Sequence, residues 1–432
     1  MQKFRIEDDL SFQDDETIRR EQQRLLNEHL AYCRKQSPYY RRILADLPEQ
    51  RFRLEDLPSL PLTAKNDLAQ HNHDFTAVPD TEIADLCFTS GTTGRPCRIT
   101  YTRQDLDRLA YNDALGFLAA GMKPSDNILL TCTIDRCFIA GLAYYMGVLK
   151  VGATAVRNGL NSLESHTEII RDGGITGIVG VPSFLAKLGQ HLHNSGIDSS
   201  AIRQVICIGE PLRNREMQLT PLGKILETFW PGAVFSTYAS SEMATSFTEC
   251  QQRCGGHPPA DLAIVEIIGE DGQPLPPGQC GEVTVTPLQV TGMPLLRFRT
   301  GDISFQLPEK CACGRNTLRL GPVLGRRAQM LKVRGTTLFP NVFFHVLDGI
   351  AGVDNYYLEV SGDALSDELD LYISFHSGDI ESLHIREALY ARSRLHINLH
   401  CVSCEQARQK VFGTSRKPTR FFDLRQKQPG QD

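Results

Sequence analysis

The chain has 432 residues, of which 41% are hydrophobic, and its 46 basic and 51 acidic residues give a formal net charge of −5. This length favours two or more domains, and the lack of a basic excess argues against a nucleic-acid-binding protein. The first residues lack the apolar stretch of a signal peptide, and no segment approaches the roughly 20 apolar residues of a membrane span. We therefore expect a cytoplasmic protein that acts without a membrane.

Short apolar strands alternate with helices over the first half of the chain. Apolar runs predict strands at 86–88, 98–102, 127–132, 153–156, 177–181 and 205–208. Helical spacing predicts helices at 15–47 with a break at Ser37-Pro38, and at 102–120, 138–146, 163–172 and 183–193. Such alternation is typical of an α/β fold with layers of parallel strands and helices, in which ligands bind at the carboxyl ends of the strands.

The pattern changes to β-rich from residue 263. Apolar runs separated by tight turns predict strands at 263–268 and 281–286. Further strands at 356–360 and 368–373 and a helix at 381–393 predict a small α+β domain at the C-terminus. The sequence thus predicts a large N-terminal domain over residues 1–325, with a β-rich subdomain at about 245–325, and a small mobile C-terminal domain over 326–432.

A loop of hydroxyls and glycines, Thr-Ser-Gly-Thr-Thr-Gly-Arg-Pro, follows the first predicted strand at 89–96. Glycines permit positive φ and close backbone approach, and successive N–H groups with Ser and Thr hydroxyls form an anion site suited to a polyphosphate. This is not a Walker A loop, because no Gly-Lys-Ser/Thr follows the last glycine. An ordinary turn is the alternative interpretation of the loop taken alone.

The loop resembles the phosphate loop of the adenylate-forming superfamily, which includes acyl- and aryl-CoA ligases. Other motifs of that superfamily follow in the same order: Gly-Glu-Pro at 209–211, Tyr-Ala-Ser-Ser-Glu at 238–242, Thr-Gly-Asp at 300–302, Gly-Arg at 325–326 and a lysine at 417. Residues 37–68, with Thr63 as a predicted helix N-cap, look like the N-terminal region of phenylacetate–CoA ligases. The chain is therefore identified as a phenylacetate–CoA ligase-like member of the superfamily.

The resemblance implies roles for individual residues. It implies that Lys417, Glu242 and Thr89 are catalytic, and that Glu242 also holds Mg²⁺, which takes few carboxylates beside phosphate oxygens. The implied ATP-binding residues are Ser90, Gly91, Thr92, Thr93, Gly94, Gly209, Glu210, Pro211, Tyr238, Ala239, Ser240, Ser241, Asp302 and Arg326. Among them, Tyr238 would stack on adenine and Asp302 would accept hydrogen bonds from the ribose hydroxyls.

Two of the cysteine clusters are suited to zinc, which prefers four N or S ligands in a tetrahedron. Cys250, Cys254 and His257 form one, and Cys311 with Cys313 forms the other. The resemblance implies that Cys250, His257, Cys311 and Cys313 are the ligands of a structural zinc, with Cys254 as a possible replacement for one of them. Cys401 and Cys404 have no second pair nearby, so we interpret them as ordinary thiols.

The implied reaction takes a carboxylic acid, ATP and coenzyme A, and proceeds through an acyl-adenylate. Two departures from the superfamily leave alternatives open: Ala328-Gln329 replaces the usual hinge Asp, and Arg416 replaces the glycine before Lys417. The alternatives are an adenylating enzyme with another acceptor, such as an amine or a carrier protein, and a catalytically weakened homologue that only binds nucleotide or acid. A homodimer is compatible with each of these three functions.

The predicted acid pocket lies among residues 135–145, 181–184 and 209–211. Phe138, Tyr145 and Phe184 suit an aromatic or apolar acid, whereas Asp135 and Arg136 suit a polar group. The sequence does not decide between these two chemistries.

Overall fold

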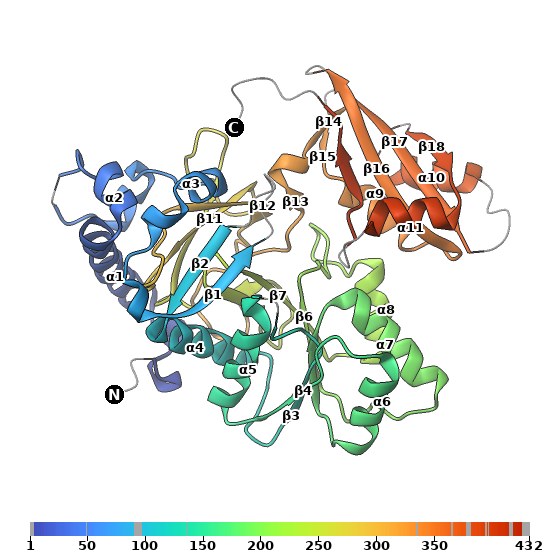
Figure 1. Cartoon of the computed structure of the whole chain (residues 1–432), viewed down its shortest axis with the longest axis horizontal. Helices are drawn as coiled ribbons and strands as arrows, with labels where there is room; N and C mark the ends of the chain where they lie inside the picture. The colour runs from blue at the N-terminus through green and yellow to red at the C-terminus, as the bar shows by residue number, and fades with distance from the viewer. Residues whose placement is uncertain are drawn as a thin grey trace. The chain divides into compact units, whose positions relative to one another are not determined.

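The structure is a computed structural model that describes residues 4–48, 50–89, 97–135, 137–333, 336–363, 366–376, 382–393, 395, 397–413 and 418–425 (Figure 1). The chain divides into two compact units. The first comprises residues 1–219 and 223–323, and the second comprises residues 220–222 and 324–432.

A seven-stranded sheet with the order β4-β3-β5-β6-β7-β8-β9 forms the centre of the first unit. Its strands are β3 (Asn127–Leu130), β4 (Thr154–Arg157), β5 (Gly177–Gly180), β6 (Gln204–Ile208), β7 (Val234–Ser240), β8 (Thr245–Glu249) and β9 (Gly256–His257). Neighbouring strands from β4 to β7 are parallel, and β7-β8 and β8-β9 are antiparallel. The α/β prediction is confirmed, and the antiparallel extension is a feature that the sequence analysis did not predict.

Helices cover both faces of this sheet (Figure 1). They are α4 (Arg103–Ala119), α5 (Ile139–Val151), α6 (Leu163–Asp172), α7 (Pro182–Asn194) and α8 (Pro221–Phe229). Ile128, Val179 and Ile206 pack with residues of α4 and α5, whereas the adjacent Leu129 and Ile178 pack with residues of α6, α7 and α8. Successive side chains of a strand point to opposite faces, so apolar runs without alternation suit a sheet that is buried on both sides.

Local signals support two of these helices. The Thr102 side chain accepts from the Asp105 N–H and the Asp105 carboxylate accepts from the Thr102 N–H, which forms a capping box at the start of α4. In α5, a Cβ added at Gly141 would lie 1.9 Å from the Thr133 carbonyl oxygen, so only glycine fits there. Both features agree with the helices that the sequence predicts.

A hairpin of β1 (Ile83–Thr89) and β2 (Cys97–Thr102) precedes α4. The strands are antiparallel, and Thr89 pairs with Cys97 across the ends that flank residues 90–96. The predicted phosphate-loop residues Ser90, Gly91, Thr92, Thr93 and Gly94 lie outside the described residues.

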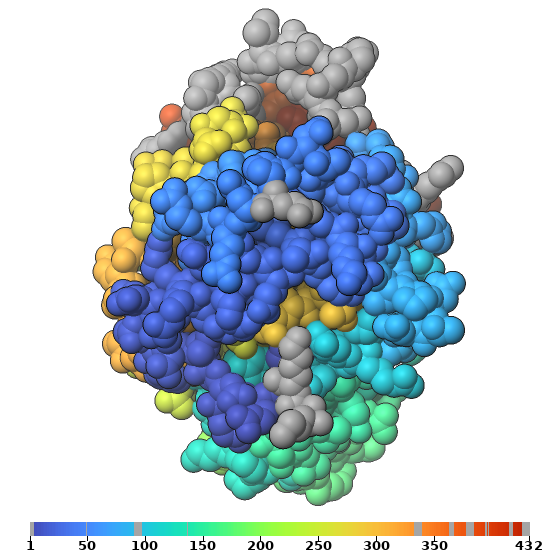
Figure 2. Space-filling view, turned by 90° about the vertical axis from the view of Figure 1, so that its left-hand side faces the viewer, coloured from blue at the N-terminus to red at the C-terminus, as the bar shows by residue number. Residues whose placement is uncertain are grey.

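The N-terminal segment contains α1 (Asp15–Gln36), α2 (Pro38–Ile43) and α3 (Lys65–Gln70). Ser37 ends α1 and caps α2, as its Ser-Pro break predicts. The predicted N-cap at Thr63 is wrong: α3 has Ala64 at its N-cap, and the Thr63 hydroxyl bonds with Tyr40 instead, at 2.7 Å. Figure 2 shows this segment, in blue, over a broad part of one face of the first unit.

Three antiparallel strands, β10 (Ala263–Ile268), β11 (Cys280–Pro287) and β12 (Phe298–Phe305), form the β-rich part of the first unit. Their buried residues share one apolar cluster with α1, α2 and the β1-β2 hairpin. The His29 ring on α1 bonds with the Leu295 carbonyl at 2.8 Å, so α1 is fixed to the segment before β12.

The second unit is α+β, as predicted. Its elements are β13 (Gly325–Arg326), β14 (Leu331–Val333), β15 (Thr336–Leu338), α9 (Asn341–Leu347), β16 (Val353–Asp363), β17 (Ser366–Phe375), α10 (Ser382–Ser393), β18 (Asn398–Cys401), α11 (Cys404–Phe412) and β19 (Phe421–Asp423). A four-stranded sheet has the order β18-β17-β16-β19, and its Leu358, Leu371 and Ile373 pack with Ile385 of α10. In the part of the chain described, no helix combines the length and the apolar character needed to cross a membrane.

Candidate functional site

Two of the predicted nucleotide motifs lie side by side in the first unit. The Tyr238 hydroxyl on β7 donates to Asp302 Oδ2 on β12 at 2.8 Å. Burial and the Asp302 charge raise the pKa of Tyr238 well above its ordinary value, so Tyr238 is the donor of this bond. The structure places Tyr238, Ala239 and Ser240 within β7.

The segment after β7 is attached to the hairpin that flanks residues 90–96. Tyr101 on β2 donates its hydroxyl to the Ser241 carbonyl at 2.8 Å, and the Cys87 thiol on β1 lies 3.6 Å from the Ser241 hydroxyl. Thr89, the last residue of β1, stands on the same hairpin. Three motifs that are far apart in sequence, at 89–96, 238–242 and 300–302, are therefore joined through their flanking residues.

Glu242 has a buried side chain, only 7% exposed, and its Oε1 lies 3.6 Å from Lys65 Nζ. Among the described residues, no hydrogen bond to this oxygen is found, and such a carboxylate is a suitable hard ligand for Mg²⁺. Lys65 was not among the candidate site residues, because a lone lysine at a helix start carries no sequence signal of a site.

The Gly-Glu-Pro segment follows β6 at the carboxyl edge of the sheet. Gly209 has φ +79°, a left-handed conformation that favours glycine. Glu210 accepts hydrogen bonds from the N–H and hydroxyl of Ser183, both at 2.9 Å, and so caps the first turn of α7. Because Ile208 pairs with Thr237 on β7, this segment lies beside Tyr238.

The predicted acid-pocket residues have diverse surroundings. Phe138 is 45% exposed. The Tyr145 ring lies 5.3 Å from the Arg157 guanidinium, and Phe184 packs edge-on against the His166 ring at 5.2 Å. Arg136 lies outside the described residues.

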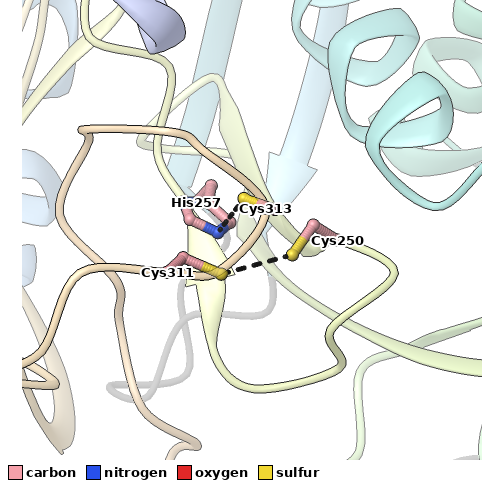
Figure 3. A group of neighbouring side chains, drawn as sticks. All are labelled: Cys250, His257, Cys311 and Cys313. Carbon is pink, nitrogen blue, oxygen red and sulfur yellow. Dashed lines mark hydrogen bonds between the residues drawn. The ribbon is translucent and has the colours of Figure 1, made fainter.

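Cys250, His257, Cys311 and Cys313 form a cluster, with ligand atoms that all lie within 4.8 Å of one another (Figure 3). Cys250 Sγ is 3.6 Å from Cys311 Sγ, and Cys313 Sγ is 3.7 Å from His257 Nε2. A tetrahedral zinc with bonds of about 2.0–2.3 Å has ligand separations of about 3.5–3.8 Å, so the four donors fit zinc. Cys254 is not a member of this cluster.

The histidine of the cluster is oriented for a metal. His257 Nδ1 bonds with the Thr317 hydroxyl at 3.1 Å, which leaves Nε2 toward the three cysteines. Burial and the charges of Arg315 and Arg319 lower the pKa of His257 to about 4, so its ring is neutral at physiological pH. Neutral imidazole is the form that coordinates a metal.

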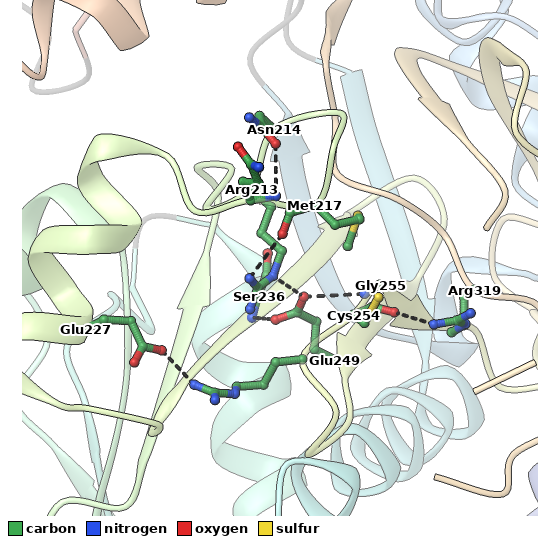
Figure 4. A network of polar contacts seen from close by, with 11 residues as sticks. Arg213, Asn214, Met217, Glu227, Ser236, Glu249, Cys254, Gly255 and Arg319 are labelled. Atoms are coloured by element: carbon green, nitrogen blue, oxygen red, sulfur yellow. Dashed lines mark hydrogen bonds and ion pairs between the residues drawn. The ribbon is translucent and has the colours of Figure 1, made fainter. Parts of the chain in front are cut away.

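A buried ion pair connects this cluster with the segment after Gly-Glu-Pro (Figure 4). Arg213 Nε lies 2.8 Å from Glu249 Oε1, and the two side chains are 11% and 3% exposed. Glu249 also accepts from the Ser236 N–H at 2.9 Å, and Cys250 follows it directly in the chain. The pair therefore joins the segment that carries Cys250, β7 and the segment that begins at Gly209.

The remaining predicted site residues fall elsewhere. Arg326 belongs to β13 of the second unit, and Ala328 lies in a 3-10 helix, Arg327–Gln329. Lys417 and Arg416 lie outside the described residues. Cys401 and Cys404 are exposed, and the Cys404 thiol donates to the Phe375 carbonyl at 3.1 Å, a local contact within the second unit.

Comparison with known proteins indicates the family of the chain. The family model of the AMP-binding enzymes matches residues 27–292. The phenylacetate-coenzyme A ligase of Thermus thermophilus is 32% identical over 374 residues, which cover 83% of this chain and 82% of that protein. That of Escherichia coli is 26% identical over 423 residues, 92% of each chain.

A solved structure has the same fold over almost the whole chain. The structure of a 2-hydroxyisobutyryl-CoA ligase in the postadenylation state matches with a TM-score of 0.82, over 96% of this chain and 91% of that one. Its sequence identity is 19%, so this likeness concerns the fold alone. The chain therefore belongs to the AMP-binding enzyme family, among the relatives of the phenylacetate-coenzyme A ligases, as its motifs predict.

Proposed function

We propose that the protein is an ATP-dependent carboxylate–CoA ligase of the AMP-forming class. The observation that carries this function is the bonded arrangement of Tyr238, Ser241 and Asp302 around the hairpin that flanks residues 90–96. It brings together the motifs suited to adenine, ribose and phosphates, on a chain whose relatives are phenylacetate-coenzyme A ligases.

In the first step, a carboxylate oxygen of the acid attacks the α-phosphorus of ATP. The new bond joins that oxygen to phosphorus, the bond from the α-phosphorus to the bridging oxygen breaks, and pyrophosphate leaves. Negative charge spreads over the phosphoryl oxygens, so fixed donors and cations there stabilise the transition state. Residues 89–94 would bind the phosphates, Lys417 would contact the reacting oxygens, and Asp302 would accept from the ribose.

Glu242 would hold Mg²⁺. Its carboxylate is buried, and within the described part of the chain its Oε1 has Lys65 at 3.6 Å and no hydrogen bond, which suits an ion that takes one protein oxygen and several phosphate oxygens. When bound, Mg²⁺ neutralises part of the triphosphate charge.

In the second step, the thiol of coenzyme A attacks the acyl carbonyl carbon, the bond to the AMP oxygen breaks, and the thiol proton passes to solvent. The protein needs no covalent nucleophile for either step, so none of its cysteines has to react. The hinge between the two steps would lie near Ala328. This alanine replaces the usual hinge Asp and belongs to a 3-10 helix, Arg327–Gln329.

Zinc would be held by Cys250, His257, Cys311 and Cys313, whose spacing fits a closed tetrahedral site. A closed site has no open position for substrate, so we infer a structural role. The ion would fix the segment after β12 to the segments that follow β8.

An acid-dependent pyrophosphate exchange screen tests the proposal. An aromatic or apolar acid is the expected substrate, from Phe138, Tyr145 and Phe184, with a polar acid as the alternative from Asp135. Exchange with any acid excludes a protein that only binds nucleotide. Consumption of coenzyme A with the active acid then separates a CoA ligase from an enzyme with an amine or carrier-protein acceptor.

The assembly state and the location stay predictions. A homodimer would appear in light scattering as twice the mass of the chain, and cell fractionation would test the expected cytoplasmic location.

A further inference from the structure

Lys65 is a charged neighbour of Glu242, and it belongs to none of the nucleotide motifs. Its Nζ lies 3.6 Å from Glu242 Oε1, and its side chain is 36% exposed while that of Glu242 is 7% exposed. This separation exceeds hydrogen-bond range, so the two groups attract one another without a direct bond. Because no direct hydrogen bond has to break, the pair can separate at a small cost in free energy when another ion binds to Glu242.

The backbone that carries Lys65 is fixed in place. Thr63 forms a parallel bridge with Phe298 on β12, in which the Arg299 N–H donates to the Thr63 carbonyl at 2.8 Å. The Asp67 carboxylate accepts from the Ala64 N–H at 2.7 Å and so fixes the first turn of α3. Lys65 therefore starts from a rigid position beside the strand that also carries Asp302.

The charges of the pair also act on Cys97, the residue that directly follows the predicted phosphate loop. Burial raises the pKa of the Cys97 thiol, the Glu242 charge raises it further, and the Lys65 charge opposes this rise, so both charges act on Cys97. Cys97 is the first residue of β2, directly after residues 90–96. A Lys65 ammonium that left Glu242 would thus be near the place expected for the phosphates.

A magnesium ion and an ammonium compete for the same carboxylate oxygen, because both are cations. We propose that Lys65 is a further positioning residue of the ATP site: it holds the Glu242 carboxylate before Mg-ATP binds, yields it to Mg²⁺, and then pairs with the triphosphate. This inference rests on the proposed function, because it takes Glu242 as the Mg²⁺ ligand.

The exchange predicts opposite changes in two binding constants. In Lys65→Ala, a non-hydrolysable ATP analogue with Mg²⁺ should bind about tenfold more weakly, because a charged phosphate contact is lost. Mn²⁺ alone should bind the same variant several-fold more tightly, because no ammonium competes for Glu242. Calorimetry measures the first constant and electron paramagnetic resonance the second, and neither depends on turnover.

Three further variants complete the test. Lys65→Arg keeps the charge and should retain analogue affinity within about threefold, and Lys65→Gln replaces the alanine variant if that one does not fold. The matched control is Lys123→Ala, which removes an exposed lysine of the same unit and should change neither constant. Unchanged constants in a folded Lys65→Ala or Lys65→Gln, or weaker binding of both ligands, would overturn the inference.

The wild-type protein separates this inference from the proposed function. Absence of pyrophosphate exchange with every acid would refute the ligase, whereas exchange in the wild type together with unchanged constants in the variants would refute only the role of Lys65.

Discussion

The Cys/His cluster and the group of nucleotide motifs are both built from segments far apart in sequence, but their polar groups are arranged differently. In the cluster, four donor atoms face a common centre. The two sulfur atoms of Cys250 and Cys311 are 3.6 Å apart, and Cys313 Sγ is 3.7 Å from His257 Nε2. In the nucleotide group, the residues face one another: Tyr238 donates to Asp302, and Lys65 pairs with Glu242.

We interpret this difference as one between a proposed site for a permanent ion and a proposed site that exchanges partners. In the proposed zinc site, four soft donors without a central cation would leave buried thiols and an imidazole close together. In the nucleotide group, Tyr238 and Asp302 already bond to each other, so they would have to release one another when substrate binds. They stabilise the protein without substrate and still allow substrate to leave.

The sharpest way to break the comparison is to remove a metal ligand. Cys311→Ser should abolish stoichiometric zinc and lower the free energy of unfolding by about 5 kcal/mol, since binding of a structural metal adds to folding stability. Elemental analysis and urea unfolding measure the two effects. The control is Cys254→Ser, which changes a nearby cysteine outside the cluster and should keep both zinc and stability. Equal losses in both variants would contradict the assigned ligand set.

A smaller effect is expected from the ion pair that connects the two groups. Arg213→Ala leaves Glu249 buried without its charged partner and should cost about 3 kcal/mol of unfolding free energy. Arg253→Ala is the matched control, because its pair with Glu227 is more exposed, at 33% and 21%, and should contribute under about 1 kcal/mol. Urea unfolding compares them, and similar values would show that burial of the first pair has no energetic consequence.

Within the nucleotide group, substitution of Asp302 should lower activity more than substitution of its partner Tyr238. Asp302→Ala removes the expected ribose acceptor and should lower kcat/KM for ATP in pyrophosphate exchange about 100-fold, roughly 2.7 kcal/mol. Tyr238→Phe keeps the ring and loses one hydrogen bond, so about a fivefold loss is expected, near 1 kcal/mol. A larger loss in Tyr238→Phe would assign the leading role to the hydroxyl.

The smallest effect concerns the pH dependence of stability, through the buried Asp113 on α4. Burial raises the pKa of Asp113 on α4 to about 7, although the hydrogen bonds from Ser246 of β8 and from Asn112 lower it in part. The native state then holds a proton that the unfolded state has lost, so stability should fall as pH rises from about 4 to 7. Between pH 5.5 and 7.5 the loss is about 2 kcal/mol, measured by urea unfolding. Asp113→Asn should remove this slope, and an unchanged slope would assign it to another group.

Much of the fold could be predicted from local signals. The predicted helix at 163–172 agrees with α6, and Thr102 caps α4 as its position before Asp105 indicates. Thr63 shows the limit of such signals. Its hydroxyl suits an N-cap, yet bonds to Tyr40 and to β12 hold it in a strand-like bridge, because tertiary contacts outweigh local preference.

The candidate site was predictable only in part. The resemblance to the phenylacetate–CoA ligases indicated the four members of the cluster, whereas spacing alone left Cys254 as an alternative ligand. Arg108 is fully buried on α4 and donates to the Leu288 and Leu262 carbonyls, but a single arginine on a helix normally indicates exposure. The sequence analysis also missed Arg213, Glu249 and Lys65. Their partners are distant in the chain, and no sequence pattern joins them.

The contact between Glu210 and Ser183 has a consequence for engineering the acid preference. The Glu210 carboxylate is already committed to the first turn of α7, with both of its oxygens engaged at 2.9 Å. A mutant library at position 210 would therefore mostly sample damaged helices rather than new specificities. Randomising position 138, a predicted acid-pocket residue that is 45% exposed, leaves that anchor intact and makes a better starting point for redesign.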